Sequence, residues 1–229
     1  MRTLISLILF AFLLGCEQIV ERAKPATIQK TPAITEQTGR FTINPQFSEA
    51  YPFREGLAAV RIGDDTTGKW GFIDKQGKMV INPQFDDVIF ERGFSEGLAG
   101  VRIGDDTTGK WAFIDKQGKT VINPQFSFTS PFREGLAAVL IGDSKTGKWA
   151  FIDKQGKMVI NPQFSEAYPF REGLAAVRIG DSKTGKWGFI DKQGKMVINP
   201  QFDHVTFEGT FSEGLAGVRI GGKWGYISQ

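Results

Sequence analysis

Hydrophobic residues follow three different patterns along this chain of 229 residues. Residues 4–15 form an apolar run interrupted only by Ser6, and residues 17–40 show no hydrophobic period. From residue 41 onward, short apolar segments alternate with polar turns, and no window carries a sustained helical period. The pattern predicts three parts: a leader at residues 1–15, a linking segment at residues 16–40 and one all-β domain at residues 41–229.

The leader predicts export. Its run of 12 apolar positions would span about 18 Å as a helix, well short of a hydrocarbon core of ~30 Å. Arg2 stands before the run, and a short basic start followed by a short apolar segment is typical of a secretory signal. The run ends in Leu-Leu-Gly-Cys, and Cys16 is the only cysteine of the chain.

These four residues resemble the lipobox of bacterial lipoproteins. The resemblance implies that residues 1–15 are a signal peptide and that Cys16 receives a diacylglycerol, with palmitate as a further acyl group, and becomes the N-terminus. It implies a lipid-anchored, extracytoplasmic protein of the cell envelope, and Glu17 favours the outer membrane in a Gram-negative cell. A plain signal peptide with an incidental cysteine, or an uncleaved short anchor, is the alternative.

The linking segment at residues 16–40 is rich in Pro, Thr, Gln and Ala. Such a composition is typical of a flexible tether. A lipid-anchored domain needs a tether of this kind to stand away from the bilayer surface.

Residues 41–229 repeat one unit five times. Ile-Asn-Pro-Gln-Phe begins at Ile43, Ile81, Ile122, Ile160 and Ile198, and Glu-Gly-Leu-Ala begins at Glu55, Glu96, Glu134, Glu172 and Glu213. A Lys-Trp pair recurs with its tryptophan at Trp70, Trp111, Trp149, Trp187 and Trp224. Self-similarity at a period of 37–41 residues indicates a repeat architecture.

Each copy is expected to form a three-stranded meander. In the first copy the predicted strands are residues 57–62, 70–74 and 78–81, joined by a hairpin loop and by a tight turn with Gly77 at a positive φ. Pro83 marks the expected end of the third strand, and residues 88–90 are a candidate short fourth strand. Both faces of such a sheet are apolar, which predicts that neighbouring sheets cover one another.

The block at residues 69–78, Lys-Trp-Gly-Phe-Ile-Asp-Lys-Gln-Gly-Lys, recurs in phase with the two motifs above. Together they resemble the WG repeats, also called KWG repeats. Ala112 and Ala150 replace the glycine in two copies. The resemblance implies an all-β repeat architecture and no particular reaction.

The two ends of the repeat region favour a closed, propeller-like toroid of five β-meanders. An isolated Ile-Asn-Pro-Gln-Phe segment at Ile43 precedes the first copy, and the last copy stops after the strand of Trp224. Pairing the segment with that strand would close the ring and remove exposed edges. An open β-solenoid is the alternative. We expect a monomer in either case.

The residue types present argue against catalysis and against cofactors. One cysteine and one histidine exclude cysteine zinc sites and multi-histidine metal sites, and we predict no catalytic residue, metal or cofactor. A net charge of +3 gives no argument for nucleic acid. The acidic pairs at Asp64 and Asp105 lie on hairpin tips, where aspartate forms turns; calcium binding there is the alternative.

Two sets of residues are candidates for a role beyond the strands. The repeated tryptophans are expected to pack in the core, with a carbohydrate platform as the alternative. The connectors differ between copies, and loops on a rigid scaffold are where binding is usually found. The candidate binding surface comprises Tyr51, Asp87, Arg92, Phe128, Tyr168 and His204; neutral variation of surface loops would explain the same differences.

These observations predict a non-catalytic, lipid-anchored interaction scaffold of the cell envelope, not an enzyme. Its partners would be the membrane, through the lipid, and a protein that the sequence does not identify. Carbohydrate or peptidoglycan binding is the alternative function, and a hydrolase is the third class considered.

Overall fold

The computed structural model describes residues 40–89, 93–181, 183–206, 209 and 211–229. The predicted signal peptide, Cys16, nearly all of the tether and Arg92 lie outside these described residues. The chain divides into two units, Met1–Arg40 and Phe41–Gln229, and the fold described below is that of the second. Its described part consists of strands and turns, and no helix in it is long and apolar enough to cross a membrane.

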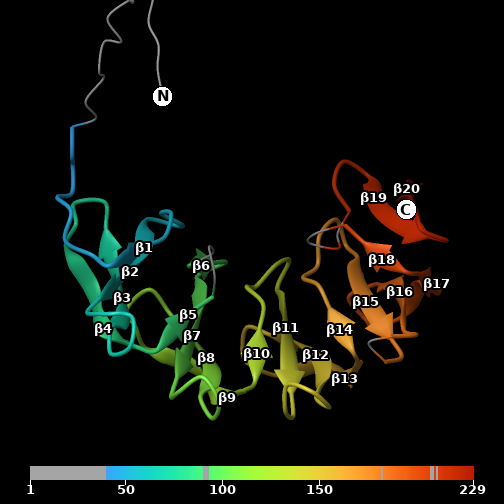
Figure 1. Ribbon diagram of the computed structural model, residues 1–229, viewed down its shortest axis with the longest axis horizontal. Coiled ribbons are helices and arrows are strands. Elements are labelled where there is room, and N and C mark those ends of the chain that lie inside the picture. The colour runs from blue at the N-terminus through green and yellow to red at the C-terminus, as the bar shows by residue number, and fades with distance from the viewer. Residues whose placement is uncertain (1–39, 90–92, 182, 207–208, 210) are drawn as a thin grey trace, which may run out of the picture. The chain divides into compact units, whose positions relative to one another are not determined.

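The strands form five antiparallel sheets, one for each copy of the repeat, and Figure 1 shows them side by side in chain order. The first sheet comprises β1 (Glu49–Ala50), β2 (Leu57–Ile62), β3 (Lys69–Asp74) and β4 (Met79–Phe85). The second comprises β5 (Asp87–Val88), β6 (Phe94–Ser95), β7 (Leu98–Ile103), β8 (Lys110–Ile114) and β9 (Thr120–Phe126). The third comprises β10 (Phe128–Thr129), β11 (Leu136–Ile141), β12 (Lys148–Asp153) and β13 (Met158–Phe164). The fourth comprises β14 (Glu166–Ala167), β15 (Ala175–Ile179), β16 (Lys186–Ile190) and β17 (Met196–Phe202), and the fifth β18 (His204–Val205), β19 (Leu215–Ile220) and β20 (Lys223–Ser228). The all-β class with five repeats is confirmed.

The third strand of the meander is longer than predicted, and its proline lies inside it. Trp70 pairs with Phe85, whereas Phe72 pairs with Ile81, so β4 carries extra residues between these two pairs. This register shift is a β-bulge, and Pro83 falls within it. A bulge is one of the few places in a sheet where proline is tolerated, because the ladder there does not need its missing N–H.

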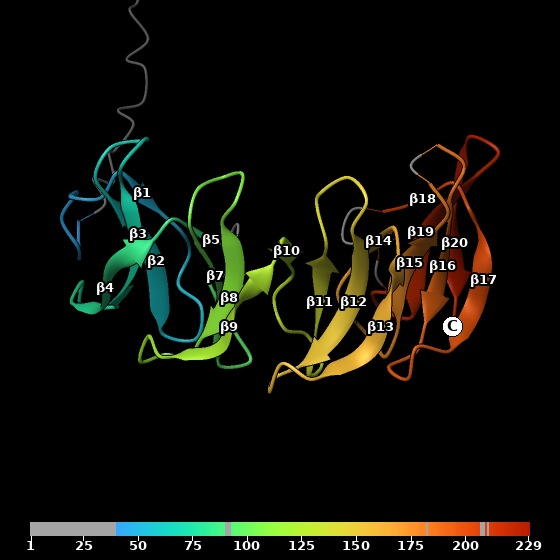
Figure 2. The same ribbon diagram turned by 90° about the horizontal axis from the view of Figure 1, so that it is seen from below.

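The sheets stack face to face, and the core lies between them (Figure 2). Between the first two sheets, Trp70, Phe72 and Ile81 pack against side chains of the second sheet such as Val101 and Ile114. Equivalent clusters join the second sheet to the third, the third to the fourth and the fourth to the fifth. Each of the three inner sheets therefore buries both faces because it has a neighbour on either side, as the apolar strand pattern predicted.

A glutamate with a left-handed backbone occupies the turn before the second strand of every sheet. In the first sheet Arg54 and Leu57 bridge across a two-residue turn in which Glu55 and Gly56 have φ of 49° and 92°. The equivalent glutamates have φ of 52–55° in the other copies: Glu96, Glu134, Glu172 and Glu213. Positive φ is uncommon for a residue other than glycine, asparagine or aspartate, so this conformation costs free energy that contacts elsewhere can offset.

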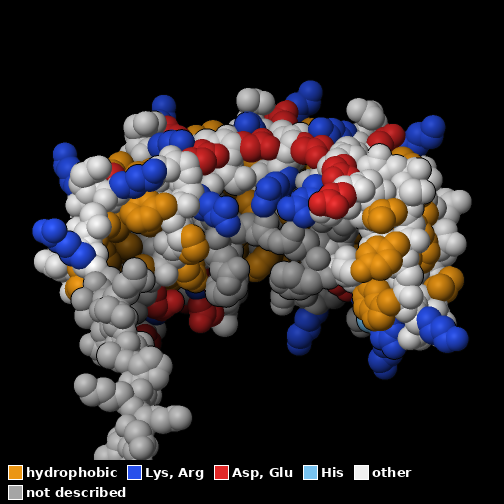
Figure 3. Space-filling model, turned by 90° about the horizontal axis from the view of Figure 1, so that it is seen from above, with side chains coloured by type: hydrophobic (Ala, Val, Ile, Leu, Met, Phe, Trp, Pro, Cys, Tyr) orange, Lys and Arg blue, Asp and Glu red, His pale blue; other side chains and the backbone are white. Residues whose placement is uncertain are grey.

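The compensation comes from the next copy along the chain. The Glu55 carboxylate accepts a hydrogen bond of 3.0 Å from the Gly97 N–H and forms an ion pair of 3.0 Å with Lys116. Glu96 and Glu134 have the same two kinds of partner, Gly135 with Lys154 and Gly173 with Lys192. Acidic and basic side chains accordingly alternate across the sheets in Figure 3. We call this row of contacts the glutamate ladder.

The ladder alters the titration of its carboxylates. Partial burial raises the pKa of Glu134, but the Lys192 ammonium and the Gly173 N–H outweigh burial, so the pKa is lowered from its ordinary value of 4.5. Glu55 behaves in the same way with Lys116 and Gly97. These carboxylates are therefore charged throughout the neutral range and hold their partners by charge-assisted hydrogen bonds.

The ladder ends at the fifth sheet. The Glu172 carboxylate accepts from the N–H groups of Glu213 and Gly214, and the Gln229 side-chain amide donates to the Glu172 carbonyl at 2.8 Å. Gln229 stands five residues after Trp224, as Lys116 stands after Trp111, and Lys116 likewise donates to the Glu55 carbonyl. Among the described residues the Glu213 carboxylate has no partner.

The strand pairing that would close the five sheets into a ring is not present in the described residues. Ile43 and Phe47 pack instead on the outer face of the first sheet, against Ala58, Val60 and Ile73. The fifth sheet ends at β20, and no described strand pairs with the free edge of β20. Closure of the five sheets into a ring is therefore not confirmed.

Removing a buried ring from the middle of the row should cost far more than removing its equivalent from the last sheet. Phe151 and Tyr226 stand at the same position of the repeat, but Phe151 is fully buried and Tyr226 is exposed. We expect Phe151→Ala to lower the free energy of unfolding by about 3–5 kcal/mol and Tyr226→Ala by less than about 1 kcal/mol. Denaturant titration of both variants measures this, and equal losses would contradict the stacked arrangement.

Loss of a ladder carboxylate should destabilise the chain only where a next copy is present. Glu134→Gln is expected to lower the free energy of unfolding by about 1–2 kcal/mol. Glu213→Gln is the matched control, because Glu213 has the same backbone φ of about 55° but no described partner. If both substitutions reduce stability equally, the ladder does not contribute.

The stability of the domain should fall on acidification. Because the folded pKa of Glu134 lies below its ordinary value, its stabilisation is present above that ordinary value and is lost as the pH falls through the folded pKa. Thermal melts between neutral pH and about pH 3 should show this decline. The decline should be smaller in Glu134→Gln than in the native chain, and an identical decline would exclude Glu134 as its source.

Candidate functional site

Three of the predicted connector residues lie in strands. Asp87, Phe128 and His204 occupy one equivalent position, on the short first strand of sheets two, three and five. Their cross-strand partners are Arg102, Leu140 and Arg219. Each connector thus begins with a two-residue strand in register with its neighbour, and Tyr51 and Tyr168 follow such strands directly.

Differences between copies at this position are matched across the strand pair. Arg102 forms an ion pair of 3.6 Å with Asp87, and in the first sheet Arg61 pairs with Glu49 at 2.6 Å. In the third sheet both members are apolar, Phe128 opposite Leu140. Burial raises the pKa of Asp87, and the Val88 N–H and Arg102 oppose that rise only in part. The position therefore serves cross-strand pairing.

The connector aromatics cover tryptophans. The Tyr51 ring stacks on Trp70 with ring centroids 4.7 Å apart, and Tyr168 stacks on Trp187 at 5.2 Å. Phe128 contacts the rings of two tryptophans edge-on, Trp111 at 5.5 Å and Trp149 at 6.0 Å. The predicted binding residues in the described part lie one to a sheet, and none of them lines the pocket that is described below.

The repeated tryptophans differ in exposure although their sequence context is the same. Trp70, Trp111 and Trp187 are buried between sheets, and Trp149 is half-buried. Trp224 is exposed, in contrast to the packing role expected for it, because no described sheet covers that face of β20.

The aspartates at the hairpin tips form hydrogen bonds within their own turns. The Asp64 carboxylate accepts hydrogen bonds from the N–H groups and the hydroxyls of Thr66 and Thr67, which hold its pKa well below the usual range. The hydroxyl and N–H of Thr146 likewise lower the pKa of Asp143 to about 2. Within the described ranges, no cluster of three or more His, Cys, Asp or Glu residues could hold a metal ion.

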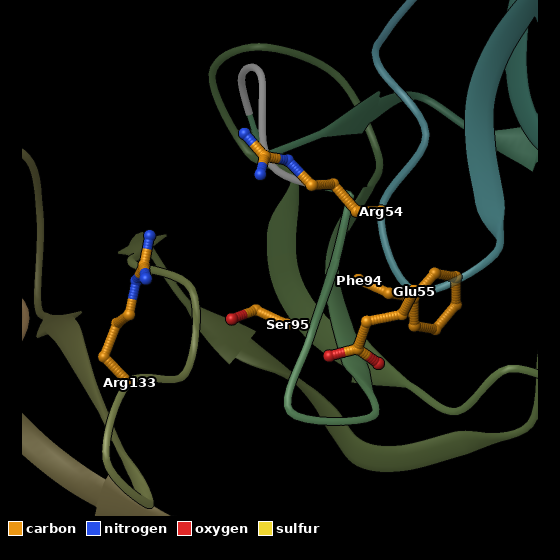
Figure 4. Close-up of a pocket in the computed structure, with 5 residues that line it drawn as sticks. All are labelled: Arg54, Glu55, Phe94, Ser95 and Arg133. Carbon is orange, nitrogen blue, oxygen red and sulfur yellow. The ribbon is translucent and has the colours of Figure 1, made fainter.

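A pocket of about 270 Å³ opens between the turns of three consecutive copies. It is lined by Arg54, Glu55, Phe94, Ser95 and Arg133. In Figure 4 the two arginines lie on either side of Ser95, with Arg54 coming from the first turn and Arg133 from the third. The Ser95 hydroxyl donates to the Phe132 carbonyl at 2.8 Å, which fixes the second turn against the third.

The charged side chains around this pocket differ in whether they have partners. The Glu55 carboxylate is engaged in the glutamate ladder, whereas the Arg54 guanidinium has no partner among the described residues and is exposed. Two guanidinium groups beside one hollow are suited to an anionic group, since each can present parallel N–H donors to a carboxylate or phosphate.

This pair of arginines cannot be recognised from the sequence alone. The residue before the glutamate is arginine in copies one, three and four and serine in copies two and five. That alternation is visible in the sequence, but only the stacking of the copies places Arg54 and Arg133 around Ser95.

The sequence model of the protein family described as "WG containing repeat" matches residues 36–64, 70–111, 111–149, 149–182 and 187–224. The chain belongs to this family. The comparison with curated proteins gives no match. The WG repeat assignment extends over all five sheets of the described fold, as the resemblance in the sequence predicted.

The glycine of the WG pair faces the bulge. A Cβ on Gly71 would lie 2.6 Å from the Ile81 carbonyl oxygen, and the same contact would arise at Gly188. Ala112 and Ala150 stand at this position in the second and third WG repeats with the same strand register. The bulge therefore adjusts to a methyl group, and glycine is favoured there without being required.

Proposed function

We propose that this WG repeat chain is a non-catalytic binding scaffold whose partner presents an acidic segment. The observation that carries the proposal is the pocket flanked by Arg54 and Arg133. Stacked sheets hold these turns in place, and polar groups on a rigid scaffold suit recognition.

The state of the neighbouring carboxylate supports binding over acid–base chemistry. Glu55 lines the pocket but is held by the Gly97 N–H and Lys116, and its lowered pKa keeps it ionised at neutral pH. A charged carboxylate that is already paired is a poor proton donor. The exposed Arg54 guanidinium has no partner among the described residues, so we take it to meet the ligand, and we take that ligand to be an acidic polypeptide segment.

Reversing the charge of the exposed arginine should weaken such binding. We expect Arg54→Glu to reduce the affinity for a short polyglutamate peptide by about tenfold, which corresponds to ~1.4 kcal/mol. Fluorescence anisotropy at low and moderate salt measures the affinity, which should also fall as salt screens the charges.

Lys78→Glu is the matched control for this measurement. It makes the same change in net charge at an exposed turn position outside the pocket. Equal losses in the two variants would indicate a nonspecific effect of charge, and binding unaffected by Arg54→Glu would contradict the proposal.

Carbohydrate or peptidoglycan binding is the second candidate function. The exposed rings of Trp224 and Tyr226 favour it, since an open aromatic face can stack on a sugar. The buried tryptophans offer no such face. A glycan pull-down that Trp224→Ala abolishes and Arg54→Glu leaves unchanged would favour this candidate over the acidic partner.

We further propose that the scaffold is a lipoprotein, anchored outside the cytoplasm through Cys16. The lipobox resemblance of residues 13–16 supports this. The tether would allow the repeats to reach partners away from the bilayer.

Cys16→Ser should abolish lipid labelling in cells and leave an unprocessed precursor, because Cys16 is the only thiol of the chain. Metabolic labelling with an alkyne fatty acid, followed by gel analysis, measures this. Ser6→Ala is the control and should still be labelled. Lipid labelling that persists in Cys16→Ser would refute the anchor.

A further inference from the structure

The two terminal sheets each expose aromatic rings whose equivalents are largely covered in the other sheets, although Ile43 and Phe47 cover the rest of the outer face of the first sheet. Phe53 is 39 % exposed, whereas its equivalents in the later copies are at most 2 % exposed: Phe94, Phe132, Phe170 and Phe211. In the fifth sheet Tyr226 is 75 % and Trp224 56 % exposed, whereas Phe72 and Trp70 at the same positions are nearly inaccessible. Hydrophobic side chains accordingly gather at both ends of the row in Figure 3.

The exposed rings of the two terminal sheets correspond to the two sides of the contact that recurs between neighbouring sheets. At each contact between neighbouring sheets, an aromatic ring of one sheet packs against the phenylalanine that precedes the glutamate turn of the following sheet. The ring pairs are Phe72–Phe94, Phe113–Phe132, Phe151–Phe170 and Phe189–Phe211, with centroids 4.7–5.1 Å apart. The ring left over in the last sheet is Tyr226, and the phenylalanine left over in the first is Phe53.

The glutamate ladder leaves a complementary pair of charges at the same two ends. The Glu213 carboxylate has no partner among the described residues, and neither has the Lys75 ammonium. At each contact between neighbouring sheets among the first four, the equivalents of these two groups form an ion pair, as Glu134 does with Lys192. An acid is therefore open at one end of the row and a base at the other.

A segment with the sequence of the strand that β20 lacks also lies on the first sheet. In the other sheets the Lys-Trp strand pairs with an Ile-Asn-Pro-Gln-Phe strand, and residues 43–47 have this sequence. Ile43 lies 3.1 Å from a Cβ built on Gly77, just as Ile81 of the preceding sheet lies 3.0 Å from a Cβ built on Gly118. Residues 43–47 thus lie on the first sheet where the last strand of a preceding sheet would lie.

We propose that the last sheet of one chain stacks on the first sheet of a second copy, head to tail. Tyr226 then packs on Phe53, Glu213 pairs with Lys75, and residues 43–47 of the second copy lie beside β20. The occupant is a second copy because the two faces belong to opposite ends of the row of sheets (Figure 1). The contact is heterologous, so it continues to further copies or closes after a set number of them. This departs from the monomer expected from the sequence.

The test uses two variants of the full chain in detergent, each blocked at one end. Phe53→Asp blocks the first sheet and Tyr226→Asp blocks the last. Light scattering, corrected for detergent, should show concentration-dependent association of the native chain and only monomer for each variant. An equal mixture of the two variants should form a dimer, because the mixture retains one intact face of each kind.

Ile103→Asp is the matched control, since Ile103 is 42 % exposed on the second sheet, away from both faces. It should associate like the native chain. A mixture of Phe53→Asp and Tyr226→Asp that stays monomeric would overturn the proposal. Closure of one chain on itself would do the same, and it would appear as a monomeric native chain whose melting temperature each variant lowers.

Discussion

The contact on which this structure depends is the one between a glutamate carboxylate and the turn of the following copy. Five glutamates adopt a positive φ, a conformation that costs free energy for a residue of this type. Glu55, Glu96 and Glu134 offset that cost by accepting a backbone N–H from the next copy and pairing with a lysine of that copy, and Glu172 accepts two backbone N–H groups. One residue thus sets the turn of its own sheet and the position of its neighbour, which couples local conformation to the stacking of the sheets.

The stacking in turn determines which side chains are available for binding. Tryptophans with identical sequence contexts are buried or exposed according to whether a sheet follows them. The pocket between Arg54 and Arg133 exists only because three copies contribute to it. A single WG repeat has neither a closed core nor this pocket, so binding and stability both depend on the array.

The sequence was sufficient for the architecture because repetition makes the pattern of strands and turns unambiguous. The positive φ of Gly77 followed from its place in a tight turn and is confirmed. Glu55 was not predicted, since propensity argues against positive φ at glutamate, and only the recurrence of Glu-Gly in every copy points to it. Pro83 was expected at the end of the third strand but lies in a bulge within it, because the sequence does not distinguish these two positions of a proline when the strand register is unknown. The connectors were taken for loops, although the paired change to Phe128 and Leu140 in one copy was visible.

The bulge at Pro83 has a consequence for the solubility of the array. The last strand of each of the first four sheets is an edge strand, and its proline and bulge interrupt the row of free N–H groups that another strand would need. The opposite edge is a strand of two residues in the same sheets. Sideways addition of foreign strands is thereby discouraged at both edges. In these four sheets, side chains are therefore more available to a binding partner than the backbone of an edge strand is.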